Sequence, residues 1–130
     1  TTYNFMGEYE IMNTFKVVKH KEKDVVIIDI SNQSAIDIVK GLRSAQEEIT
    51  KYPEKSLLIL TDATNAVYNS LTSTVIKDFA EHNTKYVKAS AVIGVDGIKG
   101  ALLKTVSIIA KRNIHNFNNQ KEALDWLVSQ

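Results

Sequence analysis

The chain contains no cysteine, and this absence excludes several kinds of chemistry. Without thiols it has no disulfides, no thiolate metal site and no cysteine nucleophile. Proline is almost as rare, since Pro53 is the only one among 130 residues. An excess of charge is also missing, because 16 basic and 15 acidic residues leave a formal net charge of +1. Such a balance does not predict binding to nucleic acid or to an acidic membrane surface.

Long apolar runs are absent as well. No stretch approaches the ~20 residues needed to cross a bilayer, and the opening TTYNFM lacks the basic start and apolar core of a signal peptide. We therefore expect a cytoplasmic protein that does not span a membrane. With 44% apolar and 24% charged residues, the composition is that of a globular protein. The length predicts a single domain over residues 1–130.

Apolar periodicity predicts a hairpin followed by four strand–helix units. The hairpin joins Phe15–His20 to a β-branched run at 25–30 across the polar residues 21–24. Strands that alternate with helices imply an α/β fold with right-handed crossovers, here a mostly parallel sheet of about five strands with one antiparallel edge strand. The predicted strands are 25–30, 56–61, 87–94 and Ile114–Phe117, and the predicted helices are 34–51, 70–84, 97–111 and a last one from 118 or 119.

The same pattern predicts helix caps and inward faces. Ser34, with Asp37 three residues on, and Asp96 are expected to cap the first and third helices. Residues at helical spacing are expected to face the sheet. These are Ile36, Val39, Leu42, Ala45 and Ile49 in the first helix, Leu71, Val75 and Phe79 in the second, Ile98, Ala101, Leu102, Thr105, Ile108 and Ile109 in the third, and Ala123, Leu124 and Leu127 in the last.

Four segments carry a resemblance to a known family. They are Leu60-Thr61-Asp62, the run YVKASAVIGVDG at 86–97, Phe117, and the run EALDWL at 122–127. Over residues 10–129 the chain resembles the SpoIIAA-like family, which is related in fold to STAS domains and to CRAL-TRIO lipid-binding domains. The resemblance implies a STAS-like α/β fold with four helices and a place among small bacterial proteins whose roles are mostly unassigned.

The resemblance also implies a candidate switch. STAS domains change partners when the serine of an Asp-Ser pair at the start of the second helix is phosphorylated, and Asn69-Ser70 stands at about that place. The chain departs from the pattern by having Asn69 for the Asp and Leu71-Thr72-Ser73 for the small residues that follow. A phosphate there would meet free backbone amides and the positive end of the helix dipole. The alternative is that Asn69 or Ser70 only caps the helix.

Other candidate sites favour a structural explanation. Asp62 follows a predicted strand, where open α/β sheets bind ligands, and Asp29 ends the preceding strand. Two carboxylates without a nucleophile or a metal ligand favour a loop cap over catalysis. Three glycines at 94, 97 and 100 have the spacing GxxGxxG, which is not the dinucleotide fingerprint and favours tight turning and close packing of the helix on the sheet. The three histidines, at 20, 82 and 115, lack the spacing of metal ligands.

Three functions remain open. The first, which we expect, is a non-enzymatic regulatory or protein-interaction module of the STAS or anti-sigma-factor-antagonist type, without cofactor or metal. The second is a binder of a lipid or other small apolar ligand in a pocket between sheet and helices. The third is an enzyme that uses Asp62. We rank it last because a nucleophile, a base and an orienting group cannot all be named. Candidates for the partner surface or switch are Asp62, Asn65, Asn69, Ser70 and Ser73, and candidates for the apolar pocket are Val75, Ile76, Phe79, Ile98, Leu102 and Leu103.

A homodimer is a further expectation. The N-terminus is rich in aromatic residues and methionine, and it can cover the edge of the sheet or pack on a second copy. An uncovered edge strand invites pairing with another chain. The residues concerned are Tyr3, Phe5, Met6, Tyr9 and Met12.

Overall fold

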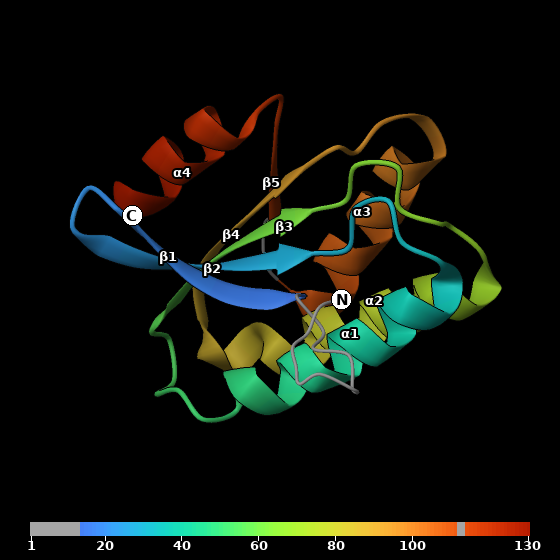
Figure 1. Ribbon diagram of the computed structural model, residues 1–130, viewed down its shortest axis with the longest axis horizontal. Helices are drawn as coiled ribbons and strands as arrows, with labels where there is room; N and C mark the ends of the chain where they lie inside the picture. The colour runs from blue at the N-terminus through green and yellow to red at the C-terminus, as the bar shows by residue number, and fades with distance from the viewer. Residues whose placement is uncertain (1–13, 112–113) are drawn as a thin grey trace, which may run out of the picture.

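The computed structural model describes residues 14–111 and 114–130, with only the backbone course for 97–99 (Figure 1). In this described part the strands form one five-stranded sheet in the order β1–β2–β3–β4–β5. β1 is antiparallel to β2, and the other neighbours are parallel. The predicted mixed, mostly parallel sheet is therefore confirmed. The strands are β1 (Phe15–His20), β2 (Lys23–Asp29), β3 (Leu57–Asp62), β4 (Val87–Ile93) and β5 (Ile114–Phe117).

Helices connect the parallel strands and follow the last one. When strand order follows the chain and every crossover is right-handed, the connecting helices share one face of the sheet. Accordingly α1, α2 and α3 lie on one side, and α4 lies on the other (Figure 1). The four predicted strand–helix units are confirmed. The helices in the described residues are α1 (Ala35–Ile49), α2 (Ser70–Asn83), α3 (Gly97–Ala110) and α4 (Gln120–Val128), with a 3-10 turn at Thr84–Tyr86.

Both faces of the central strands are buried. On the face beneath α1 and α2, Ile28 packs in one apolar cluster with Leu42. On the face beneath α4, Leu60 packs in a second cluster with Leu127. Because helices cover both faces, β2 and β3 each contain four consecutive buried apolar residues, Val25–Ile28 and Leu57–Leu60, instead of an alternation with polar residues.

The turn between β1 and β2 is tighter than the sequence predicted. Lys21 and Glu22 both have positive φ, 49° and 73°, which is the backbone of a two-residue hairpin turn. Lys23 and Asp24, expected in the turn, belong to β2 and pair with His20 and with Lys19. The prediction of a four-residue turn was therefore wrong. A two-residue hairpin turn is usually marked by a sequence such as Asn-Gly, and Lys21-Glu22 does not have one. The N-terminal aromatic residues behind the dimer expectation lie outside the described residues.

Three apolar side chains expected to face the sheet point outward instead. Ile36, Leu71 and Ile108 are 61%, 50% and 75% exposed. Their helices are rotated so that other residues are buried, among them Ile38 and Thr72. Ala101 and Thr105 are exposed as well, while the predicted inward residues Leu42, Ala45, Ile49, Val75, Phe79, Ala123, Leu124 and Leu127 are confirmed as buried. The side chain of Ile98 lies outside the described ones.

The helix caps follow the prediction in part. Ser34 accepts a hydrogen bond from the amide of Asp37 at 3.2 Å, so it caps α1 as expected. Asn119 caps α4 by accepting from the amide of Glu122 at 2.9 Å. Asp96 occupies the cap position of α3, yet its side chain makes no capping hydrogen bond with the described residues. The prediction that Asp96 is the N-cap residue of the third helix is therefore confirmed by its position.

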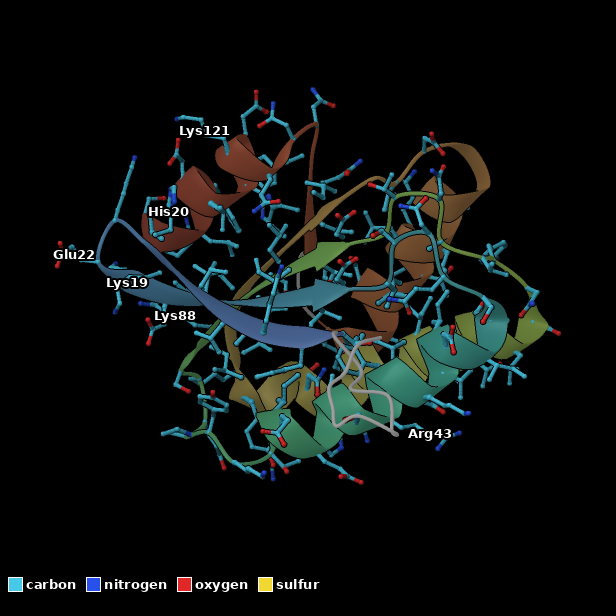
Figure 2. The ribbon with its side chains drawn as sticks, viewed as in Figure 1. Lys19, His20, Glu22, Arg43, Lys88 and Lys121 are labelled. Carbon is cyan, nitrogen blue, oxygen red and sulfur yellow. The ribbon has the colours of Figure 1, made fainter. Side chains whose placement is uncertain are left out.

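A cluster of charged side chains fastens the hairpin to α4. The carboxylate of Asp125 on α4 lies 2.8 Å from Lys121, 2.7 Å from His20 and 3.1 Å from Lys21. Figure 2 labels His20 on the hairpin and Lys121 on the neighbouring helix. The hydrogen bond from Lys121, followed by those from His20 and Lys21, holds the pKa of Asp125 well below its ordinary value. Sequence position could not reveal this contact, because His20 and Asp125 are 105 residues apart.

Replacing Asp125 with Asn is expected to reduce the dependence of stability on acid pH. The pKa of Asp125 is lowered on folding from 3.8, so its charge stabilises the folded state above about pH 4 and loses this effect as the pH falls through the folded pKa. Urea unfolding of both proteins between pH 7 and pH 3 should show a difference that shrinks toward pH 3. Asp24→Asn is the control, because Asp24 forms an exposed pair with Lys19. A difference that stays constant with pH would contradict this.

Candidate functional site

Two loops join at the edge of the sheet where the parallel strands end, which we call the carboxyl edge. These are the β2–α1 loop at 30–34 and the β3–α2 loop at 63–69, on the right in Figure 1. The amide of Asn32 donates to the carbonyl of Thr64 at 3.0 Å, and the Asn65 side chain donates to the Asn32 side chain at 3.0 Å. Asn32 and Asn65 both have φ of 53°. The two loops therefore form one connected surface.

Asp29 and Asp62 lie side by side at this edge, as the sequence suggested, because they are register partners on β2 and β3. Each carboxylate accepts hydrogen bonds from the residue two positions further along the chain. Asp62 accepts from the amide and the hydroxyl of Thr64 at 3.0 and 2.7 Å, and Asp29 accepts from the amide and the hydroxyl of Ser31. In the described sheet the strand order never reverses, so Asp62 does not lie at a topological switch point, where such sheets place their ligands. The geometry gives both carboxylates the role of turn caps.

The start of α2 is held by a reciprocal cap. Asn69 accepts from the amide of Thr72 at 2.9 Å, and the amide of Asn69 donates to the hydroxyl of Thr72 at 3.0 Å. The same hydroxyl donates to the carbonyl of Val67 at 2.9 Å, which ties the loop to the helix. Capping therefore belongs to Asn69. Ser70 is exposed, and its hydroxyl makes no hydrogen bond with any described residue, while Ser73 donates to the Ser70 carbonyl at 3.2 Å.

Three exposed apolar side chains flank Ser70, and we call them the 67–71 patch. Val67, Tyr68 and Leu71 are 36%, 43% and 50% exposed, and they are half of the six large apolar residues found exposed in the described part. The chain is 24% charged, yet residues 63–76 contain no charged side chain. Sequence reasoning missed the patch because it assigned Leu71 to the inner face of the helix. The absence of charge over residues 63–76 is visible in the sequence and could have indicated this surface.

A cavity of about 120 Å³ lies between the sheet, α2 and α3. Four of the six residues expected to line an apolar pocket line it, namely Ile76, Phe79, Leu102 and Leu103. Val75 is buried in the core and is not among the described lining residues, and the side chain of Ile98 is not described. The cavity extends from Tyr68 at the carboxyl edge to Asn83 at the end of α2. Its remaining described lining residues are Ile30, Leu42, Ile59, Thr61, Ala63, Ala66, Val67, Ala80, Ser90, Val92, Val95, Val106 and Ile114.

Gly94 brings the turn after β4 against the β3–α2 loop. Its φ is +82°, and an added Cβ would lie 2.6 Å from Thr64 Cα and closer still to the Thr64 nitrogen. The predicted tight turning is thus confirmed at Gly94. At Gly100 the expectation of close packing is wrong, since an added Cβ there would meet no described atom within 4 Å.

Neither a metal site nor a membrane span is seen in the described part. Across residues 14–111 and 114–130, no group of three or more His, Asp or Glu side chains is placed to hold a metal ion. In the same ranges every helix is too short or too polar to cross a bilayer.

Comparison with known proteins is informative at the level of solved structures. No family model matches the chain, and no curated protein sequence matches it. Among solved structures it is similar to the crystal structure of an uncharacterized protein from Shewanella loihica PV-4, described as a DUF3478 family protein with a SpoIIAA-like fold. The two share 18% identity and a TM-score of 0.60, over 87% of this chain and 91% of that one. The match shows that this chain has a SpoIIAA-like α/β fold.

Proposed function

We propose that this protein is a non-enzymatic interaction module of the STAS type, which binds a partner protein through the 67–71 patch. The exposed cluster of Val67, Tyr68 and Leu71 within an uncharged run carries this proposal. Exposed apolar clusters mark interaction sites. The cores of protein interfaces are depleted in charged residues and enriched in tyrosine, which is the composition of this patch.

The hydrogen bonds behind the patch favour this role. The hydroxyl of Thr72 binds the backbone of Val67 and of Asn69, on either side of Tyr68. Asn32 supports the loop from the neighbouring connection through Thr64 and Asn65. A surface fixed before binding loses less conformational entropy on association. The backbone that carries the patch is thus held in one conformation by these hydrogen bonds.

Ser70 offers a way to regulate binding. It is exposed between Tyr68 and Leu71, and it is not needed for capping because Asn69 supplies that contact. Phosphorylation would add a charge of about −1.5 to −2 to an uncharged surface. An apolar partner surface would then have to bury this charge, so we propose that phosphorylated Ser70 releases the partner.

The test is a comparison of purified complexes. The tagged protein, its double variant Tyr68→Ala, Leu71→Ala and the control Ile108→Ala are expressed in the source cells, and copurifying proteins are quantified by mass spectrometry. Ile108 is 75% exposed and lies on α3. A tyrosine at the centre of an interface typically contributes about 2 kcal/mol, so the double variant should lose a discrete partner that the control retains. Ser70→Glu should also lose it and Ser70→Ala should keep it.

Two results would contradict the proposal. One is an unchanged set of partners in the double variant when its thermal unfolding matches that of the wild type. The other is equal loss in the Ile108→Ala control, which would show that the loss does not depend on the patch.

A further inference from the structure

β1 is an edge strand that pairs with no described strand other than β2. The sheet order places β1 at one rim and β5 at the other (Figure 1). An open edge invites pairing with another chain, and proteins limit this with short strands, proline, bulges or lysines. β5 has only four residues, whereas β1 has six, contains no proline and pairs with β2 in one unbroken register. β1 is therefore the longer and less interrupted of the two edges.

The backbone groups that β1 leaves for another strand belong to every second residue. The amide of Asp29 donates to the carbonyl of Thr14 at 2.8 Å, so these two residues form a hydrogen-bonded pair of the antiparallel ladder. Such pairs alternate along the strands with pairs that are not hydrogen-bonded. The amides and carbonyls of Phe15, Val17 and Lys19 therefore point away from β2. These three residues carry the groups that a further strand would bind.

An exposed apolar side chain lies at the middle of this edge. Val17 is 44% exposed, and it shares one face of the strand with Phe15 and Lys19 because alternate residues point to the same side. Phe15 packs against the apolar cluster beneath α1 and α2, so Val17 continues that face toward the rim of the sheet. A second strand beside β1 would cover Val17, which the described part of this chain leaves open to solvent.

The two lysines of β1 select the register in which a second copy fits. When two β1 strands pair antiparallel through their outer sides, outward residues must lie opposite outward residues. With Val17 opposite Val17, Lys16 of each copy lies opposite Val18 of the other, and Lys19 lies opposite Phe15. No two lysines then meet. Sliding one strand by two residues either places Lys16 opposite Lys16, which is unfavourable, or leaves a shorter overlap of the described strands.

We propose that two copies of this protein associate through β1, paired antiparallel with Val17 opposite Val17 on the two-fold axis. The pairing joins two five-stranded sheets into one continuous sheet and covers both Val17 side chains. The sequence predicts a homodimer in general terms, and the structure adds the strand and the register. The 67–71 patch takes no part in this pairing, so its failure would leave the patch proposal untouched.

Single cysteines test the register. The chain has no cysteine of its own, so each introduced thiol is the only one. Val17→Cys should form a disulfide between two copies under mild oxidation, because the Cα atoms of a hydrogen-bonded pair lie about 5.5 Å apart, a distance that a disulfide spans. Lys16→Cys is the matched control on the same strand. Its two copies would lie diagonally, about 7–8 Å apart, which is too far for a disulfide.

Sedimentation equilibrium measures the association without a covalent link. The wild-type protein should sediment with twice the chain mass of 14.6 kDa. Val17→Lys should raise the dissociation constant about ten-fold or more, because it places two ammonium groups opposite each other and removes the apolar contact. Ile36→Lys is the matched control, since Ile36 is 61% exposed on α1 and should leave the association unchanged.

Three results would overturn the proposal, provided that circular dichroism and thermal unfolding show each variant to be folded. The first is a wild-type protein that sediments as a single chain at every concentration. The second is an equal effect of Val17→Lys and Ile36→Lys on the dissociation constant. The third is a disulfide that forms as readily in Lys16→Cys as in Val17→Cys, which would exclude the proposed register.

Discussion

Replacing Gly94 with Ala is expected to lower the free energy of unfolding by about 2–4 kcal/mol. A residue other than glycine is strained at a φ of +82°, and the new Cβ would overlap the Thr64 backbone. Because the obstacle is backbone, no side-chain rotation can relieve it. The turn after β4 or the β3–α2 loop must move, and that loop leads into the 67–71 patch. Urea unfolding followed by circular dichroism measures the change.

Gly100 provides the matched control for this prediction. It lies in α3, and an added Cβ would meet no described atom within 4 Å. Gly100→Ala should therefore stabilise the protein by about 0.5–1 kcal/mol through helix propensity alone. The account of Gly94 is wrong if both variants change stability by the same amount, or if Gly94→Ala stays within 0.5 kcal/mol of the wild type, about the size of an ordinary surface substitution.

Replacing Thr72 with Val is expected to cost about 2–3 kcal/mol. The two side chains have the same shape, so the packing of this fully buried residue is kept. The hydroxyl is lost, and with it the hydrogen bonds to the amide of Asn69 and the carbonyl of Val67. Both backbone groups would lose this partner, and the loop that carries Tyr68 would lose its attachment to α2. Equilibrium unfolding gives the energetic cost, and hydrogen exchange at residues 66–72 should become faster.

Thr74→Val tests whether the position of the hydroxyl matters. The Thr74 side chain is exposed, and its hydroxyl donates to the carbonyl of Ser70 at 2.9 Å within the helix. A mid-helix bond of this kind adds little, so the variant should stay within about 0.5 kcal/mol of the wild type. Equal effects of the two substitutions would mean that the Thr72 hydroxyl does not organise the loop.

The reciprocal cap of α2 accounts for part of the 67–71 patch. Burial of a threonine at the first turn of α2 is unusual for a polar side chain, and it is stable here because its hydroxyl is satisfied by the loop. Burial of Thr72 rotates the helix so that Leu71 points outward. The exposed leucine is therefore a consequence of the reciprocal cap. The same contacts that start the helix also form the surface proposed to bind a partner.

Strand positions could be predicted from the sequence because helices cover both faces of the sheet. Continuous apolar runs such as those of β2 and β3 are typical of strands that are buried on both faces. These runs predicted where the strands lie in the chain, and their alternation with helices predicted the parallel pairing. The antiparallel edge strand followed from the hairpin. The tight turn at Lys21 and Glu22 could not be predicted, since its backbone is set by strand register and not by a glycine or an asparagine.

The buried face of a helix was harder to predict where apolar residues occur on two of its sides. In α1, Ile36 and Ile38 are both apolar, and periodicity alone does not decide which is buried. In α2 the buried residue is Thr72, whose burial depends on a contact with the loop. Four cavity residues were found because they extend the inner faces of α2 and α3. Asn83 was not found, because a lone buried amide at a helix end leaves no periodic signal.

Photocrosslinking in living cells would test the central claim most directly, namely that the 67–71 patch contacts a partner protein. A benzophenone amino acid is placed at position 68 and, in a separate protein, at position 108, which is also exposed and lies on α3. The account predicts a discrete crosslinked protein at position 68 that is absent at position 108 and is lost when Ser70→Glu is added. No adduct at position 68, or the same adducts at both positions, would contradict it.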